Sequence, residues 1–261
     1  MTNPTHHFDT QAFDDLAGLC SRFTGRRLQS PTRSTVPLLD LVYNSRAEWH
    51  RLLKGLTASP DCSVHFEFGV PSPKSGGNAS QTDALFSSDT TVYTVEAKWT
   101  EPPDSQNVAK RISESESDGG DPRLTVDGWL AHLQPFAAGP LRIDELTDVV
   151  YQMIHRAASA AYVAGRRKLK PDLVYLHFVP SPDDRSATTE HYVAELTRLH
   201  ERLGRPNSFP FRVIEMPLEA TRAFDAIKDL DKHSPATSER VREALCGGPL
   251  FTFGAPIITG I

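Results

Sequence analysis

The sequence lacks the features that would place it in a membrane or in an oxidising compartment. None of its hydrophobic runs approaches the roughly 18 consecutive apolar residues of a membrane-spanning helix. Its first ten residues, MTNPTHHFDT, have neither the basic start nor the apolar centre of a secretory signal. Its three cysteines, Cys20, Cys62 and Cys246, form an odd and scattered set that fits neither a disulfide framework nor a zinc site. We therefore expect a cytoplasmic protein with no structural metal and no membrane contact.

The chain also lacks the short motifs of several enzyme classes. It contains no G-x-S-x-G nucleophile elbow, no Walker phosphate loop, no dinucleotide-binding fingerprint and no H-E-x-x-H zinc motif. Its ten histidines do not gather at metal-ligand spacing, and His177 lies in an apolar stretch where a hydrogen-bonded core histidine is the simpler interpretation. None of these chemistries is therefore indicated.

A large positive charge is absent as well. The 28 Lys and Arg residues are outnumbered by 33 Asp and Glu residues, which gives a formal net charge of −5. The run Ser113 to Asp121 holds part of this acidic excess. The overall balance removes the broad positive field of many nucleic-acid-binding proteins, but it does not exclude a local basic surface.

Hydrophobic spacing divides the chain into three parts of one expected domain: an N-terminal arm (1–36), a core (37–180) and a C-terminal extension (181–261). Helices are expected over 13–23, 38–56, 144–165, 188–203, 220–230 and 238–245. Strands are expected over 62–70, 83–86, 91–99, 173–179 and 211–216. The stretch 100–140 contains several prolines and no clear period, which indicates an irregular lid or insertion.

This order of elements predicts an α/β fold with a mixed central sheet flanked by helices. The first three strands are joined by connections short enough for antiparallel pairing, whereas the later strand-helix-strand units imply parallel pairing. The core therefore reads αβββαβ, and it is extended by a C-terminal αβ unit and further helices.

Charged residues interrupt the apolar strand TVYTVEAKW. Alternation places Glu96 and Lys98 on one face of this strand, together with Val92 and Thr94. Burying either charge alone would cost several kcal/mol unless it were paired or bound to a metal. A hairpin with the preceding strand would bring Asp83 beside Glu96. Two converging carboxylates make a site for a hard divalent cation such as Mg²⁺ or Mn²⁺.

This constellation resembles the PD-(D/E)XK nuclease superfamily, which has the restriction-endonuclease-like fold. Asp83 and the run Glu96, Ala97, Lys98 stand where that family has its acidic pair and its lysine, although Thr82 stands where the family pattern has proline. The family core matches the expected elements from Leu38 to Val179. The resemblance implies Mg²⁺-dependent hydrolysis of phosphodiester bonds, in DNA and less often in RNA, in an enzyme of restriction, phage defence or repair. A homodimer is compatible with it.

The resemblance also implies roles for individual residues. Asp83, Glu96 and the backbone carbonyl of Ala97 would hold the metal, and the metal would lower the pKa of a bound water molecule. Lys98 would orient the attacking water or stabilise the charge that develops on the phosphate. On this interpretation Lys98→Ala abolishes cleavage and leaves folding nearly intact.

Two further acids are candidates for the same site. Glu67 lies on the first core strand and Glu48 on the first core helix, and related enzymes often carry an additional acid on one of these elements. Either residue joins the metal site or simply faces solvent.

The long helix carries a polar stripe that includes Gln152 and Arg156. The default interpretation of such a stripe is a solvated face. The resemblance instead implies that Gln152 reaches toward the metal site, and Arg156 could hold a phosphate. Three cations follow: Arg166, Arg167 and Lys168. They either interact favourably with the helix dipole at its C-terminus or contact the phosphates of a nucleic-acid backbone.

Two alternatives remain open. A catalytically silent member of the fold could act as a nucleic-acid-binding or protein-interaction module, which the acidic balance favours. In an unrelated α/β protein, Glu96 and Lys98 would form an ordinary ion pair on a solvent-facing strand.

Overall fold

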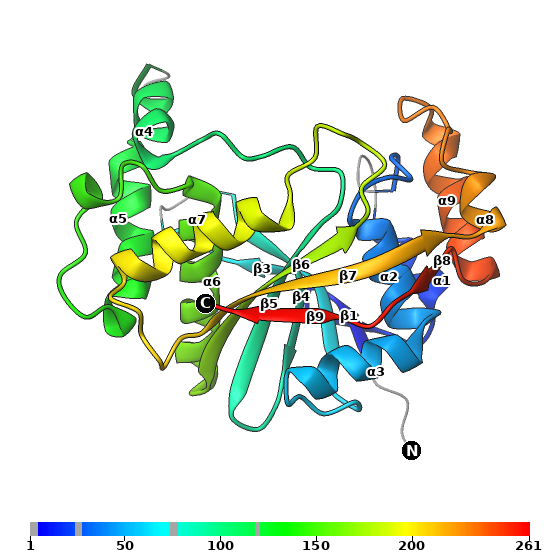
Figure 1. The fold of residues 1–261 in the computed structure, drawn as a ribbon, viewed down its shortest axis with the longest axis horizontal. Helices are drawn as coiled ribbons and strands as arrows, with labels where there is room; N and C mark the ends of the chain where they lie inside the picture. Colours follow the sequence, from blue (N-terminus) through cyan, green and yellow to red (C-terminus); the bar gives the residue numbers. More distant parts are fainter. Residues whose placement is uncertain (1–4, 24–27, 74–77, 118–120) are drawn as a thin grey trace.

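A mixed β-sheet of nine strands forms the centre of the molecule, with helices on both faces (Figure 1). The computed structural model describes residues 5–23, 28–73, 78–117 and 121–261. The expected α/β fold with a mixed, helix-flanked sheet is therefore confirmed.

The sheet has the strand order β2-β1-β3-β4-β5-β6-β7-β8, and β9 pairs with β7. Strand β4 is antiparallel to both of its neighbours, β3 and β5, whereas β5, β6 and β7 are parallel, as their connections predict. The strands are β1 (His6–Phe8), β2 (Gln11–Phe13), β3 (Val64–Val70), β4 (Ser80–Ser87), β5 (Thr91–Lys98), β6 (Lys170–Val179), β7 (Phe211–Ala220), β8 (Phe251–Phe253) and β9 (Ile257–Gly260).

Each face of the sheet has its own apolar core. One core packs against α1 (Leu16–Cys20), α2 (Thr35–Tyr43), α3 (Arg46–Gly55), α8 (Arg222–Asp225) and α9 (Pro235–Gly247). The other packs against α4 (Val108–Ser117), α5 (Pro122–Leu133), α6 (Tyr151–Arg167) and α7 (Thr189–Arg202), and it includes the short 3-10 turns η2 (Gln134–Phe136) and η3 (Ile143–Glu145). Burial of apolar surface on both faces supplies the main driving force for folding.

The side chains of β5 alternate between these two cores as expected. Tyr93, Val95 and Ala97 lie in the core shared with α2 and α3. Val92 lies in the core shared with α6. Glu96 and Lys98 have the parity of Val92 and therefore point toward α6.

The stretch 100–140 is not irregular, because it contains α4 and α5. Asp121 caps the start of α5 by accepting a hydrogen bond from the N–H of Leu124, and Pro122 occupies the first turn. Proline is tolerated there because the first helical N–H groups have no partner within the helix. Pro122, one of the prolines that suggested a loop, thus helps to start a helix. Part of the acidic run, residues 118–120, lies outside the described residues.

Two other helices differ from their expected bounds. The helix expected over 38–56 is divided at Asn44, whose side chain donates hydrogen bonds to Asp40 and to the carbonyl oxygens of Leu245 and Gly248. Helix α6 begins at Tyr151 rather than at residue 144. The backbone just before α6 is hydrogen-bonded to the segment that precedes α4: Val108 N–H donates to the carbonyl oxygen of Val149, and Tyr151 N–H donates to that of Gln106.

The two ends of the chain extend the sheet. The arm contains the expected helix as the short helix α1, and it also contributes the hairpin β1–β2, whose strand β1 pairs in parallel with β3. The apolar tail forms β8 and β9, which both pair with β7. Among the described helices none is both long and apolar enough to cross a lipid bilayer.

Candidate active site

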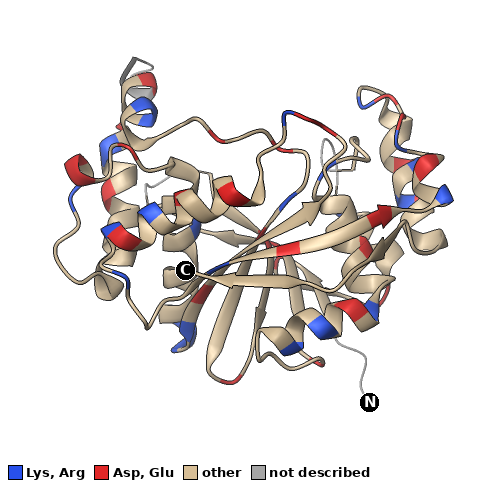
Figure 2. Cartoon of the chain, in the orientation of Figure 1, with Lys and Arg blue, Asp and Glu red and all other residues tan. Residues whose placement is uncertain are grey.

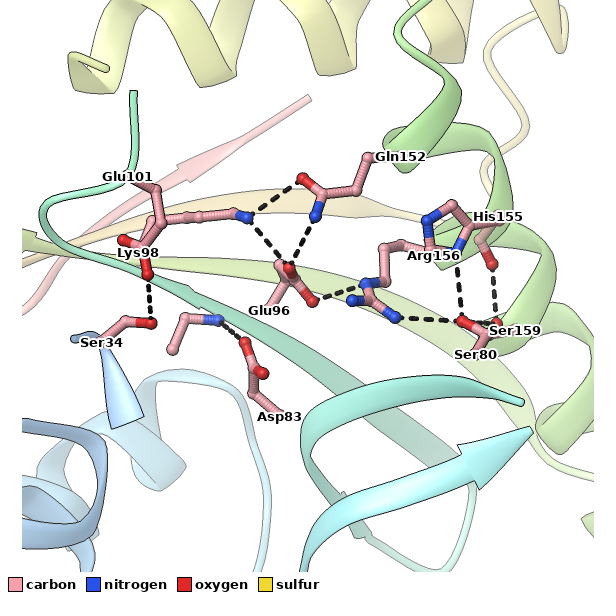
Figure 3. A network of polar contacts seen from close by, with 11 residues as sticks. Ser34, Ser80, Asp83, Glu96, Lys98, Glu101, Gln152, His155, Arg156 and Ser159 are labelled. Atoms are coloured by element: carbon pink, nitrogen blue, oxygen red, sulfur yellow. Dashed lines mark hydrogen bonds and ion pairs between the residues drawn. The ribbon is translucent and has the colours of Figure 1, made fainter. Parts of the chain in front are cut away.

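Five charged and polar side chains meet between β4, β5 and the first half of α6 (Figure 3). Asp83 comes from β4, Glu96 and Lys98 come from β5, and Gln152 and Arg156 come from α6. The structure therefore brings together the acidic pair and lysine suggested by the sequence, and adds two residues of the helix stripe.

Asp83 is fixed by the backbone of the neighbouring strand. The paired residues of the β4–β5 ladder end at Ala84 opposite Val95, and beyond them Ala97 N–H donates to Asp83 Oδ2 at 2.8 Å. Burial, and next the charge of Glu96, place the pKa of Asp83 well above its usual value, and Arg156 acts against this only in part. Within the described residues no cation is paired directly with Asp83.

Glu96 is the centre of the cluster and is 3% exposed. Its Oε1 accepts hydrogen bonds from Lys98 Nζ at 3.0 Å and from Gln152 Nε2 at 3.3 Å. Its Oε2 lies 2.6 Å from Arg156 Nε, an ion pair without the alignment of a hydrogen bond. Burial alone would raise the pKa of Glu96, but the charges of Arg156 and Lys98 outweigh it and hold this pKa below its usual value.

Lys98 is buried with its partners. Its Nζ donates to Gln152 Oε1 at 3.0 Å as well as to Glu96, so the three side chains form a closed triangle of hydrogen bonds. Burial would lower the pKa of Lys98, but the carboxylates of Glu96 and Asp83 raise it above its usual value. Glu96 and Lys98 do form an ion pair, yet the interpretation that placed it on a solvent-facing strand is wrong, because Lys98 is 7% exposed.

The polar stripe of α6 faces the sheet, so its interpretation as a solvated face is also wrong. Ser80 Oγ on β4 lies 3.1 Å from His155 Nδ1, 3.1 Å from Ser159 Oγ and 3.0 Å from Arg156 Nη1. Burial, and next the charge of Arg156, lower the pKa of His155 to about 3, so this imidazole is neutral at pH 7. The 3–4 spacing of these polar residues was visible in the sequence, but it could not show which way the stripe faced.

Glu67 lies beside Asp83 at an irregularity of β3. Its backbone has φ 51°, a left-handed conformation that is unfavourable for a residue with a Cβ atom. The alternation of β3 reverses here: Val64 and Phe66 lie in the core with α2, whereas Phe68 packs against the core with α6. Regular strand alternation would place all three on one face, so the irregularity at Glu67 interrupts it. The Glu67 side chain is buried rather than exposed to solvent, and its charge helps to raise the pKa of Asp83.

Glu48 is not brought into this cluster. It is half-buried in the first turn of α3, whose buried side chains Trp49, Leu52 and Leu53 pack on the face of the sheet opposite to α6. The two acids proposed from the sequence are thus distinguished, and Glu67 is the one near Asp83.

The basic residues after the stripe lie far from the cluster. Fifteen positions separate Gln152 from Arg167, which corresponds to roughly 22 Å along α6. Arg167 Nη1 donates to Ser87, and Lys168 ends the helix as a left-handed cap with φ 57°. Figure 2 shows basic and acidic residues interspersed over the outer helices in this view.

Two residues near the cluster had not been singled out, the buried Tyr175 and the half-buried Glu101, and a third, His177, is the hydrogen-bonded core histidine that was expected. Tyr175 on β6 is opposite Glu96, is fully buried, and has a hydroxyl group without a hydrogen-bond partner among the described residues. Glu101 follows β5 and accepts hydrogen bonds from Ser34 and from Trp99 N–H. His177, opposite Lys98, bonds to Thr189 through Nδ1, but its Nε2 has no partner within the same described ranges.

The ligand atoms suit a hard cation with few protein ligands. In the described parts of the chain, no three His, Cys, Asp or Glu side chains are gathered so as to hold a metal ion. Asp83 and Glu96 nevertheless supply two carboxylates. Mg²⁺ is commonly bound by one or two carboxylates, with water and substrate phosphate completing its coordination. A bound cation would also stabilise the ionised form of Asp83, which burial disfavours.

Comparison with known proteins gives a family without an assigned function. No curated protein and no solved structure matches the chain. A domain of unknown function, DUF6946, matches residues 11–210, which include the whole cluster around Glu96. The chain therefore belongs to the DUF6946 family.

Proposed function

We propose that this protein is a divalent-metal-dependent phosphodiesterase of the PD-(D/E)XK type that acts on DNA. The observation that carries the proposal is the meeting of Asp83, Glu96 and Lys98 on one face of β4 and β5, with Glu96 and Lys98 buried and bonded to α6. Burying these charges costs desolvation free energy, and a site that binds a cation and a phosphate gives a reason for that cost.

The arrangement of elements supports the same proposal. Helices α2 and α3 precede the antiparallel strands β3, β4 and β5, and these are followed, after the inserted helices α4 and α5, by α6 and the parallel strand β6. This is the αβββαβ order of the restriction-endonuclease-like core, so we assign that finer fold here. The remaining strands extend the sheet at both edges.

Asp83 and Glu96 would hold Mg²⁺ or Mn²⁺, with the backbone carbonyl of Ala97 as a third ligand. The N–H of Ala97 points to Asp83, and within a ladder the N–H and C=O groups of one residue face the same neighbouring strand. Glu67 would add negative charge to this site. When bound, the cation would activate water and polarise the phosphate.

The other residues of the site stabilise charge on the substrate or hold the charged side chains in place. Lys98 would stabilise the negative charge that develops on the phosphate oxygens, as a compact ammonium group can. Gln152 bonds to both Lys98 and Glu96 and so keeps the Nζ atom and the carboxylate in a fixed relation. RNA is a second possible substrate, since none of these contacts reads the sugar.

Cleavage assays on linear, circular and single-stranded DNA with Mg²⁺ or Mn²⁺ test the proposal. We expect metal-dependent cleavage by the wild type and a loss of at least about 100-fold in Asp83→Asn. Asp148→Asn is the matched control, because Asp148 is an exposed carboxylate that pairs with Arg202 on the surface. Equal cleavage by wild type and Asp83→Asn would contradict the proposal.

One observation favours a silent nuclease-fold protein that binds nucleic acid or another protein. Both oxygens of Glu96 already have partners, and its charge is matched by Lys98 and Arg156. Such a protein would bind DNA or a protein partner with no metal dependence and no cleavage, so the same assays separate the two functions.

A further inference from the structure

We infer that Arg156 is a counter-ion that changes partner: it holds Glu96 in the metal-free protein and transfers to the substrate phosphate when a cation takes its place. This inference deepens the proposed function and rests on it. Arg156 thereby makes the binding of metal and of phosphate cooperative.

The two oxygens of Glu96 are held in different ways. Oε1 belongs to the closed triangle with Lys98 and Gln152 and accepts two directed hydrogen bonds. Oε2 has only the 2.6 Å contact with Arg156 Nε, without hydrogen-bond alignment. A cation can therefore take Oε2 without breaking the triangle, and Arg156 is the group that it must displace.

Arg156 is placed to move a short distance and remain in the site. Its Nη1 is bonded to Ser80 at 3.0 Å, and it lies one helical turn after Gln152. The Arg156 side chain as a whole is 14% exposed, whereas that of Glu96 is 4% exposed, so Arg156 is the partner with more access to solvent. A guanidinium can hold phosphate oxygens through two parallel hydrogen bonds, which suits it to a phosphate arriving from solvent.

The charges of the cluster favour such an exchange. Asp83 and Glu96 can carry two negative charges, and Lys98 and Arg156 carry two positive charges. Adding a divalent cation alone leaves an excess of positive charge in the site, which is costly. A negatively charged phosphate group offsets this excess, so metal and phosphate each favour the other's binding.

Removal of Arg156 should therefore strengthen metal binding in the absence of phosphate. In calorimetric titrations we expect Arg156→Gln to bind Mn²⁺ at least about fivefold more tightly than the wild type, because nothing then competes for Glu96 Oε2. Thymidine 5′-monophosphate, which contains no phosphodiester bond to cleave, should tighten Mn²⁺ binding by the wild type and do so much less in Arg156→Gln.

Arg202→Gln is the matched control, since it also breaks an ion pair between an arginine and a carboxylate, but on the surface. It should leave Mn²⁺ binding unchanged. If Arg156→Gln does not fold, the wild type provides a second measurement: Mg²⁺ should shift the NMR resonance of the Arg156 Nε–H group, with Arg156→Lys used for its assignment.

Each outcome decides the inference. Mn²⁺ binding by Arg156→Gln that is equal to or weaker than in the wild type, or an Arg156 resonance that does not move at saturating Mg²⁺, overturns it. In those cases the proposed function stands if Asp83→Asn still loses metal binding. Absence of Mn²⁺ binding by the wild type overturns both.

Discussion

The carboxylate of Asp83 accepts a hydrogen bond from the backbone N–H of Ala97 at 2.8 Å. This bond follows directly after the last paired residues of the β4–β5 ladder, Ala84 and Val95. Asp83 thus satisfies a buried backbone donor of the central sheet as well as supplying charge to the candidate site, and the two roles can be separated by mutation.

Asp83→Asn and Asp83→Ala should differ in stability. Asparagine keeps an oxygen acceptor for Ala97 N–H, whereas alanine leaves this donor unpaired, which costs about 1–3 kcal/mol. Because the ionised form of Asp83 is disfavoured in the fold, Asp83→Asn should be at least as stable as the wild type. Urea unfolding at pH 7 measures both differences, and equal stability of the two variants would refute the capping role.

Lys98→Met should remove activity and also cost stability. Loss of Lys98 leaves Gln152 Oε1 without its donor and takes one of two cations from the buried Glu96. We expect cleavage to fall by at least about 100-fold and the free energy of unfolding to fall by about 3 kcal/mol. The sequence alone suggested an almost unaffected fold, but the burial of Lys98 argues against this. A variant with wild-type stability would show that the triangle contributes little.

Glu67→Gly and Glu67→Ala test the backbone irregularity in β3. Both remove the carboxylate, but only glycine adopts φ 51° without a steric cost. Glu67→Gly should therefore be more stable than Glu67→Ala by about 1 kcal/mol. Thermal or urea unfolding of the pair gives this difference directly. If alanine is the more stable residue, the left-handed conformation is not strained.

His6→Phe should reduce the sensitivity of folding to acid. Burial, and next the charges of Arg46 and His7, lower the pKa of His6 to about 4. The unfolded chain therefore binds the proton more readily, and stability is lost as pH falls from about 6.5 toward 4. Between pH 7 and pH 5 the wild type should lose about 2 kcal/mol more than His6→Phe.

The phenylalanine ring keeps the contacts of His6 with Tyr43 and Phe66. Urea unfolding at the two pH values checks the prediction. Parallel pH dependence in the two proteins would mean that His6 does not carry this effect.

The sequence was most informative where periodicity and burial agree. The strand 91–99 was identified within one residue, because its alternation of apolar residues is strict, and the same alternation correctly placed Glu96 and Lys98 on one face. The later strand-helix-strand units were also found, since the apolar run of β6 is typical of a strand covered on both faces.

The predictions that were wrong came from sequence features that are compatible with two structures. Pro122 breaks a helix when it is internal but favours the first turn of one, and only the cap by Asp121 decides between them. A polar stripe such as that of Gln152 and Arg156 faces either solvent or a buried charge cluster. The partner is Ser80, more than 70 residues away in the chain, so spacing could not resolve the choice.

The central claim is that Asp83 and Glu96 together bind a divalent cation, and calorimetric titration of Mn²⁺ into the wild type and Asp83→Asn tests it most directly. We predict binding at one site in the wild type and its loss in Asp83→Asn, which keeps the bond to Ala97 and hence the fold. No Mn²⁺ binding by the wild type, or equal binding by the two proteins, would contradict the claim and leave Glu96 with Lys98 and Arg156 as a buried structural ion-pair network.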